Sequence, residues 1–161
     1  MPKLQYTLFS EISYDSLRGR VIEILRTEYS DFNHHETLRA KESDAMLALE
    51  EERLRGFIQI FDRPVDNKDA TPQQKSLGYD AIYVEPEFRN NGVALEMQLN
   101  LHDWARTEGY KKIVTEPLAP EVARLIMKTQ DAEKKLGINN TYICHINNGI
   151  TASIEFNSNQ P

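Results

Sequence analysis

Cysteine is nearly absent from this chain: among 161 residues there is one, Cys144. A single thiol excludes a disulfide within the chain and any zinc site with two or more cysteine ligands. Long apolar runs are also missing, since none approaches the roughly 20 residues that cross a bilayer. The first residues lack the apolar core of a signal peptide. These absences predict a cytoplasmic protein without a metal site and without a membrane partner.

Basic residues are outnumbered by acidic ones. The chain has 19 Lys and Arg against 25 Asp and Glu, which gives a formal net charge of −6. Binding to nucleic acid depends on dense Lys and Arg patches, so this balance disfavours a direct nucleic-acid partner. An acidic protein suits a cationic amine better. The acidic run at residues 50–52 is predicted to be a solvated turn, with recognition of a cationic acceptor as the alternative.

The short signatures of several enzyme classes are absent as well. The chain has no Walker A, G-x-G-x-x-G, G-x-S-x-G or H-E-x-x-H sequence. A kinase, a Rossmann dehydrogenase, an α/β-hydrolase and a zincin therefore have no support. Seven glycines, seven prolines and 40% hydrophobic residues are ordinary for a globular protein. The length predicts a single domain over residues 1–161.

Hydrophobic periodicity predicts both strands and helices. Apolar residues at intervals of three and four predict helices over residues 15–29, 92–108 and 120–136, with a shorter helix at 35–41. β-type runs predict strands at 3–12, 45–50, 54–61, 77–84, 110–115, 141–146 and 150–156. Asn148-Gly149 predicts a hairpin between the last two strands, and residues 62–76 are predicted to form an exposed loop. The fold class is therefore α+β, with a mixed sheet flanked by helices.

The junction between the strand that ends near residue 84 and the next helix has the chemistry of an anion site. Free N–H groups at a helix start point outward, and the helix dipole favours negative charge. Gly92 lets an anion approach the backbone, and Arg89 adds a fixed positive charge. Asn90 and Asn91 tolerate unusual turn conformations. The junction predicts a phosphate or pyrophosphate ligand, and the alternative is an ordinary loop with a surface arginine.

This junction resembles the core motif of the GNAT N-acetyltransferase superfamily. That motif, Arg/Gln-x-x-Gly-x-Gly/Ala after a strand and opening a helix, is matched by residues 89–94, Arg-Asn-Asn-Gly-Val-Ala. The segment 134–138, Lys-Lys-Leu-Gly-Ile, resembles the end of that family's late helix. The order of elements also matches the family's along nearly the whole chain. The resemblance implies a mixed, mostly antiparallel sheet with helices on both faces and a C-terminal hairpin.

The resemblance further implies acetyl-CoA, or another acyl-CoA, as co-substrate, and direct attack of an amine on its thioester. The pyrophosphate would lie on the backbone amides after Arg89, and the pantetheine arm along residues 82–84, between two splayed strands. A backbone N–H near Val84 would serve as oxyanion donor. The amine could belong to a small metabolite, a peptide N-terminus, a protein lysine or a modified nucleobase. The implied cofactor-binding residues are Ile82, Tyr83, Val84, Arg89, Asn90, Asn91, Gly92, Val93 and Ala94.

The general acid of the family has no clear counterpart here. Many members carry a Tyr in the late helix that protonates the leaving thiolate, but Glu133 or Met127 stands at that place, depending on the alignment. The family's Asn before this helix is also missing, because Pro120 lies near its position. Tyr142, on the following strand, is the nearest other tyrosine and is a candidate catalytic residue.

The general base is likewise open. Many members carry a Glu early in the strand before the motif, and the matching position is close to Gly78. Asp80 lies two residues further on and projects from the same face of a strand. Glu116, at the end of the next strand, is a second candidate. A base acting through water is a further alternative.

The departures from the family pattern motivate a second hypothesis. The chain could be a GNAT-fold binding or regulatory protein that has lost transfer chemistry. A third hypothesis is an interaction protein without a cofactor, in which residues 89–94 form only a turn. The final hairpin could pair with a second copy of the chain, so a homodimer is an open alternative.

Five other residues attract attention in the sequence. His34 and His35 are predicted to begin a helix, and in the superfamily the first helices often wall the acceptor site, so either could contact substrate. Cys144 and its neighbour His145 project to opposite faces of a strand and form no nucleophile pair. Cys144 and Trp104 are predicted to be core residues.

Overall fold

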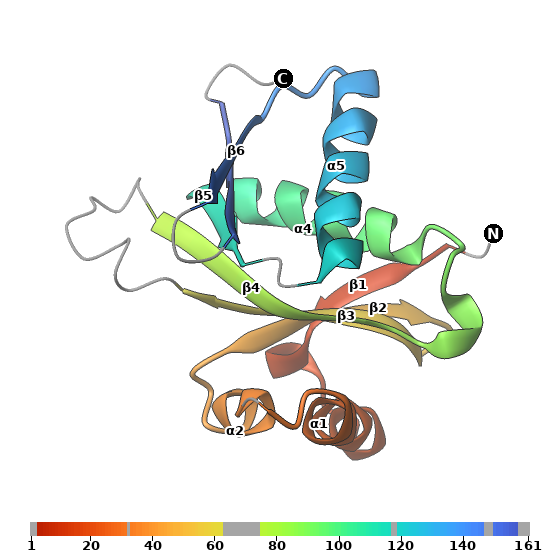
Figure 1. Ribbon diagram of the computed structural model, residues 1–161. Helices are drawn as coiled ribbons and strands as arrows, with labels where there is room; N and C mark the ends of the chain where they lie inside the picture. The colour runs from red at the N-terminus through yellow and green to blue at the C-terminus, as the bar shows by residue number, and fades with distance from the viewer. Residues whose placement is uncertain (1–2, 32, 63–74, 117–118, 147–149, 158–161) are drawn as a thin grey trace. The chain divides into compact units, whose positions relative to one another are not determined.

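The computed structural model describes residues 3–31, 33–62, 75–116, 119–146 and 150–157. Its helices and strands follow one another in the predicted order, with short 3₁₀ turns at Phe9–Glu11 and Pro86–Phe88 (Figure 1). Most of the predicted loop at 62–76 and the turn at 147–149 lie outside the described residues. The elements are β1 (Gln5–Leu8), α1 (Asp15–Glu28), α2 (His34–Arg39), β2 (Asp44–Glu50), β3 (Arg53–Asp62), β4 (Lys75–Val84), α4 (Val93–Thr107), β5 (Tyr110–Thr115), α5 (Pro120–Lys135), β6 (Thr141–Ile146) and β7 (Ile150–Glu155).

The strands form one sheet in the order β1-β2-β3-β4-β5-β7-β6. The pairs β1–β2, β2–β3, β5–β7 and β6–β7 are antiparallel, whereas β4 and β5 are parallel. The paired stretch of β4 and β5 runs from Lys75 opposite Tyr110 to Gly78 opposite Val114. The prediction of an α+β fold with a mixed, mostly antiparallel sheet and a C-terminal strand pair is confirmed.

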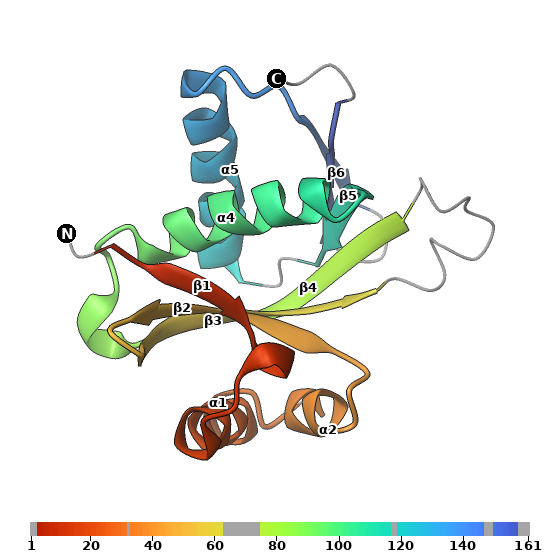
Figure 2. The same cartoon turned by 180° about the vertical axis from the view of Figure 1, so that it is seen from behind.

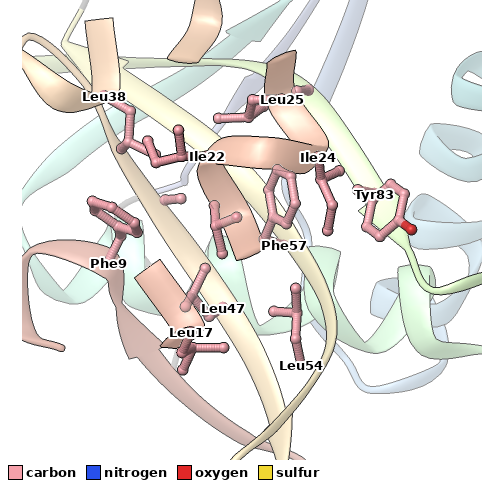
Figure 3. Packing of buried hydrophobic residues seen from close by; sticks show 13 residues of the cluster. Phe9, Leu17, Ile22, Ile24, Leu25, Leu38, Leu47, Leu54, Phe57 and Tyr83 are labelled. Atoms are coloured by element: carbon pink, nitrogen blue, oxygen red, sulfur yellow. The ribbon is translucent and has the colours of Figure 1, made fainter. Parts of the chain in front are cut away.

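Contacts divide the chain into two units. Unit 1 comprises residues 1–61 and 80–97, and unit 2 comprises residues 62–79 and 98–161. In unit 1, α1 and α2 lie against strands β1 to β3 (Figure 1), with β1 at the edge of the sheet (Figure 2). The core between them gathers apolar side chains from α1, α2 and the strands, with Phe9 and Tyr83 on opposite sides of the cluster (Figure 3).

The first strand is shorter than predicted. It ends at Leu8 instead of continuing to residue 12. The Asp44 carboxylate accepts hydrogen bonds from the backbone N–H of Ser10 at 3.0 Å and from its hydroxyl at 2.5 Å. Arg18 binds the carbonyls of Phe9 and Ile12. These side chains replace the ladder partners of a strand and turn the chain toward α1.

The sequence pattern predicts a buried face of the late helix that includes Thr129 and Leu136. Thr129 is buried as predicted, Glu133 is buried as well, and Leu136 is 66% exposed. Cys144, predicted to lie in the core, is exposed. Trp104 is half-buried against the ring of Tyr110. The core predictions for Leu136 and Cys144 are therefore wrong.

Gly56 fixes how closely β3, β4 and the start of α4 pack in unit 1. A Cβ atom at this position would lie 2.5 Å from the Tyr83 carbonyl oxygen and 2.9 Å from the Met97 Sδ. Real Cβ atoms do not approach backbone this closely, so only glycine fits. The end of β4 and the Met97 side chain of α4 therefore pack directly against the backbone of Gly56.

Candidate functional site

The junction between β4 and α4 is shaped by backbone conformations that few residues adopt. After the 3₁₀ turn, Arg89 is extended, and Asn90 and Gly92 have positive φ angles of 64° and 81°. Residues 89–92 are exposed, and α4 begins at Val93. An asparagine and a glycine are residues that tolerate the left-handed conformation. The positive φ angles at Asn90 and Gly92 turn the backbone sharply just before α4 begins.

The helix start has the properties of an anion site. The first helical hydrogen bond runs from the Glu96 N–H to the Gly92 carbonyl at 3.0 Å. The N–H groups of the three residues before Glu96 therefore have no partner within the helix. Gly92 has no side chain that could cap them, and a Cβ added there would meet nothing within 4 Å. At the positive end of the helix dipole, open space therefore lies beside amides that have no partner within the helix.

Arg89 is anchored to the end of β4. Its Nε–H donates to the Val84 carbonyl at 2.9 Å, and its guanidinium carbon lies 5.7 Å from the centre of the Tyr83 ring. The Tyr83 ring is itself stacked on Phe57, with 5.5 Å between ring centroids. These contacts hold the exposed guanidinium group of Arg89 beside the start of α4.

A second arginine, Arg55 of β3, packs against the 3₁₀ turn. The guanidinium of Arg55 lies 3.8 Å from the centre of the Phe88 ring and pairs with Glu50. Glu85 adds a ladder bond, since its N–H donates to the Arg55 carbonyl at 2.9 Å. The Glu85 carboxylate also pairs with Arg20 of α1 at 3.2 Å. The turn that precedes Arg89 is thus tied to β3 and to α1.

The last residues of β4 present an edge with polar backbone groups. Tyr83 and Glu85 face β3, as the carbonyl near Gly56 and the bond to Arg55 indicate. By strand alternation, the backbone groups of Ile82 and Val84 face the other edge. There the Ile82 carbonyl accepts a 2.6 Å hydrogen bond from the Tyr29 hydroxyl, and the Val84 carbonyl accepts the bond from Arg89. Two side chains therefore bind the carbonyls along this edge.

Asp80 lies on β4 beside a histidine of α2. The Asp80 carboxylate is 46% exposed and lies 4.0 Å from the Nδ1 of His34, whose side chain is 14% exposed. The ring of Tyr29 meets the His34 ring edge-on at 6.0 Å, and Gln59 donates to the His34 carbonyl. Burial lowers the pKa of His34, the Asp80 carboxylate opposes this shift, and His35 adds to it. The sequence singled out Asp80 and His34 separately, and the structure brings them together.

Unit 2 contains a buried polar cluster that the sequence did not predict. The Glu133 carboxylate accepts hydrogen bonds from His102 Nδ1 at 2.5 Å, from the Tyr142 hydroxyl at 2.6 Å and from Asn140. Burial acts to raise the pKa of Glu133, but His102, Tyr142 and Asn140 outweigh it and lower the pKa. Burial and Glu133 raise the pKa of Tyr142 far above its usual range. The hydroxyl of Tyr142 is thus committed to a buried carboxylate, and its neighbours Glu133 and His102 carry no recognisable motif in the sequence.

Glu116, the other candidate base, is exposed directly after β5. It belongs to unit 2, whereas Asp80 and residues 82–94 belong to unit 1. In the described residues, no group of three or more His, Cys, Asp or Glu side chains could hold a metal ion. No helix in the described part of the chain is long and apolar enough to span a membrane.

The chain is similar to one known protein family in sequence and in fold. A family model described as the acetyltransferase (GNAT) family matches residues 10–125, while no curated protein sequence matches the chain. Tetrahymena GCN5 is 12% identical with a TM-score of 0.63, over 96% of this chain and 97% of that one. A Bacillus subtilis acetyltransferase in complex with CoA is 14% identical with a TM-score of 0.59, over 96% and 99%. An aminoglycoside 6'-N-acetyltransferase complexed with coenzyme A is 15% identical with a TM-score of 0.57, over 92% and 95%. At these identities the solved structures establish the fold.

Proposed function

Because the chain belongs to the GNAT acetyltransferase family, we propose that it is an acetyl-CoA-dependent N-acetyltransferase acting on a primary amine. The observation that carries the proposal is the start of α4, where amides without a partner in the helix and open space over Gly92 lie beside Arg89. Two of the structural neighbours are complexes with CoA, which supports the same donor. Acetyl-CoA would supply the acyl thioester that the amine attacks.

In this proposal, three parts of the junction bind different parts of the donor. The amides of residues 93–95 and the guanidinium of Arg89 hold the pyrophosphate of the donor. The edge of β4 at Ile82 and Val84 pairs with the pantetheine arm, and the Val84 N–H polarises the acyl carbonyl. The carbonyls on the same edge are already held by Tyr29 and Arg89, so the edge is fixed before the donor arrives.

Of the candidate bases, the geometry favours Asp80. Its carboxylate is exposed, projects from the strand two residues before Ile82, and has His34 at 4.0 Å. It can hold the ammonium group of an acceptor and remove a proton from it. Glu116 remains the second candidate base. Tyr142 is less suited as the acid, because its proton is donated to Glu133.

Calorimetric titration with acetyl-CoA tests the donor site. Arg89→Ala removes a charge-assisted contact and is expected to weaken binding about tenfold or more. Gly92→Asp adds bulk and negative charge at the helix start and is expected to abolish binding. Gly137→Asp is the matched control, because Gly137 also has a positive φ, 76°, and open space around its Cβ position. Equal losses in the Gly92 and Gly137 variants, or no binding by the wild type, would contradict the proposal.

A second candidate function is a GNAT-fold protein that binds the donor without transferring its acyl group. The observation that favours it is the late helix, where Glu133 is buried and fully hydrogen-bonded instead of offering an acid. A panel of amines that includes polyamines, amino acids, lysine peptides and aminoglycosides separates the two. Release of CoA with any of these amines supports the transferase, and donor binding without release supports the binding protein.

A further inference from the structure

A pocket of about 330 Å³ opens in unit 1 between α1, α2 and the turn after β1. Its charged lining consists of Arg18, Arg26, Arg39 and Glu23, and Phe9, Ile22 and Gly19 complete it. Phe9 and Tyr83 lie on opposite sides of the unit 1 core (Figure 3). The pocket is therefore on the side of the core away from Tyr83 and the Arg89 junction.

The three arginines are in different states. Arg18 is fixed, because its NH1 group donates to the carbonyls of Phe9 at 3.0 Å and Ile12 at 3.2 Å, and its guanidinium carbon lies 4.3 Å from the Phe9 ring centre. Arg26 and Arg39 are exposed and form no ion pair or hydrogen bond with any described residue. Arg26 comes from α1 and Arg39 from α2. Two helices thus contribute to one pocket guanidinium groups that have no partner among the described residues.

This charge distribution is unusual for the chain. The protein carries a formal net charge of −6, yet the pocket has three arginines and a single glutamate. Like charges in one pocket repel, and an anion bound among them relieves the repulsion. Guanidinium groups match carboxylate and phosphate oxygens with two parallel hydrogen bonds. The volume falls at the lower end of the range of small-molecule sites.

We propose that this pocket binds a small organic anion with two or more negative charges, a phosphate ester or a polycarboxylate, at a site separate from that of the acyl donor. Arg26 and Arg39 hold its anionic groups from two helices. Arg18, already oriented by the turn, and the Phe9 ring form the floor. Gly19 leaves room for the ligand, since a Cβ added there would meet nothing within 4 Å.

An NMR titration of the full chain with citrate and with inorganic phosphate, at low ionic strength, tests this site. The amide of Gly19 is the reporter, and its shift is expected to saturate with at least one probe. If citrate binds more tightly than phosphate, the natural ligand is a polycarboxylate. If phosphate binds more tightly, the natural ligand is a phosphate ester. Arg26→Ser and Arg39→Ser are each expected to weaken binding about tenfold. Glu23→Gln, which removes the opposing charge, is expected to tighten binding.

Two control variants separate binding in this pocket from a general effect of surface charge and from binding at the donor site. Arg53→Ser removes an exposed arginine that has no described partner and lies outside the pocket, and it is expected to bind like the wild type. Arg89→Ala changes only the proposed donor site. It is expected to leave the Gly19 shift unchanged, because the pocket proposed here is a separate site. Wild-type affinity in the Arg26 and Arg39 variants, loss of the Gly19 shift in Arg89→Ala, or no saturation with either probe would overturn the proposal.

Discussion

His34 is a largely buried imidazole beside an exposed carboxylate, and this contrast sets its charge. Burial lowers its pKa below the usual 6.5, Asp80 opposes the shift and His35 adds to it. The ring of Tyr29 meets the His34 ring edge-on, and Gln59 donates a hydrogen bond to the His34 backbone carbonyl. If Asp80 is the base, as proposed above, a His34 that is neutral near pH 7 would lie in place to accept the proton from it.

We expect the pKa of His34, measured by NMR of its ring protons, to lie below 6.5 and to fall further in Asp80→Asn. Because the folded pKa is lower than the unfolded one, the unfolded chain binds the proton first as the pH falls. His34 therefore lowers the free energy of unfolding below about pH 6.5, and His34→Gln should flatten that loss. A pKa that rises in Asp80→Asn would show that the carboxylate does not act on this ring.

Glu133 gives the opposite case, a carboxylate held charged in the interior. Its folded pKa is lowered, so its contribution to stability is present above the unfolded value near 4.5 and is lost as the pH falls below it. Tyr142→Phe removes one donor and is expected to cost about 1 kcal/mol of stability. The kcat of the Tyr142→Phe variant should stay at the wild-type value, because the Tyr142 hydroxyl donates its hydrogen bond to Glu133. A large fall in kcat at unchanged stability would instead make Tyr142 the general acid.

At the scale of single residues, the sequence predicted the local geometry of the junction between β4 and α4 better than it predicted the interior. Arg89, Gly92 and their neighbours were identifiable because a helix start and its motif are local. Glu133 and His102 were not, because a charged residue in a helix reads as solvent-facing until its partners from other elements are known. Cys144 was misplaced for a similar reason: an apolar strand pattern does not reveal that the strand is at the edge of the sheet.

Among the elements, two glycines offer a matched pair of tests. Gly56→Ala places a methyl group 2.5 Å from the Tyr83 carbonyl and 2.9 Å from Met97, and we expect a loss of about 1–3 kcal/mol. Gly19→Ala, inside α1 with nothing within 4 Å of its Cβ, should stabilise the fold by about 0.5–1 kcal/mol. Chemical denaturation measures both. A Gly56→Ala variant as stable as the wild type would show that β3 and β4 can separate freely.

The elements themselves were largely predictable. β5 and β6 have the predicted bounds, and α1, α4 and α5 differ from prediction by a residue or so at their ends, since strong periodicity and glycine or proline stops mark them. The exception was β1, which is shortened by the Asp44 side chain of the neighbouring strand β2. Contacts between distant segments of this kind leave no trace in local sequence patterns.

For the whole molecule, the way the chain divides predicts cooperative unfolding. One boundary between the units falls between Tyr79 and Asp80, inside β4, and another between Met97 and Gln98, inside α4. Neither element can melt in one unit and stay formed in the other without breaking its own hydrogen bonds. We expect a single transition, coincident by calorimetry and by circular dichroism. Two separate transitions would contradict the prediction of one domain.

The start of α4 has a consequence for how this protein can change over evolutionary time. The donor site proposed there consists mainly of main-chain amides and a glycine. Its binding groups therefore depend on the identity of few side chains. Sequence drift can then replace most of the molecule while the donor site persists. Identities of 12–15% to solved structures of the same fold are compatible with such drift. Selection can then change the rest of the chain without disturbing the proposed donor site.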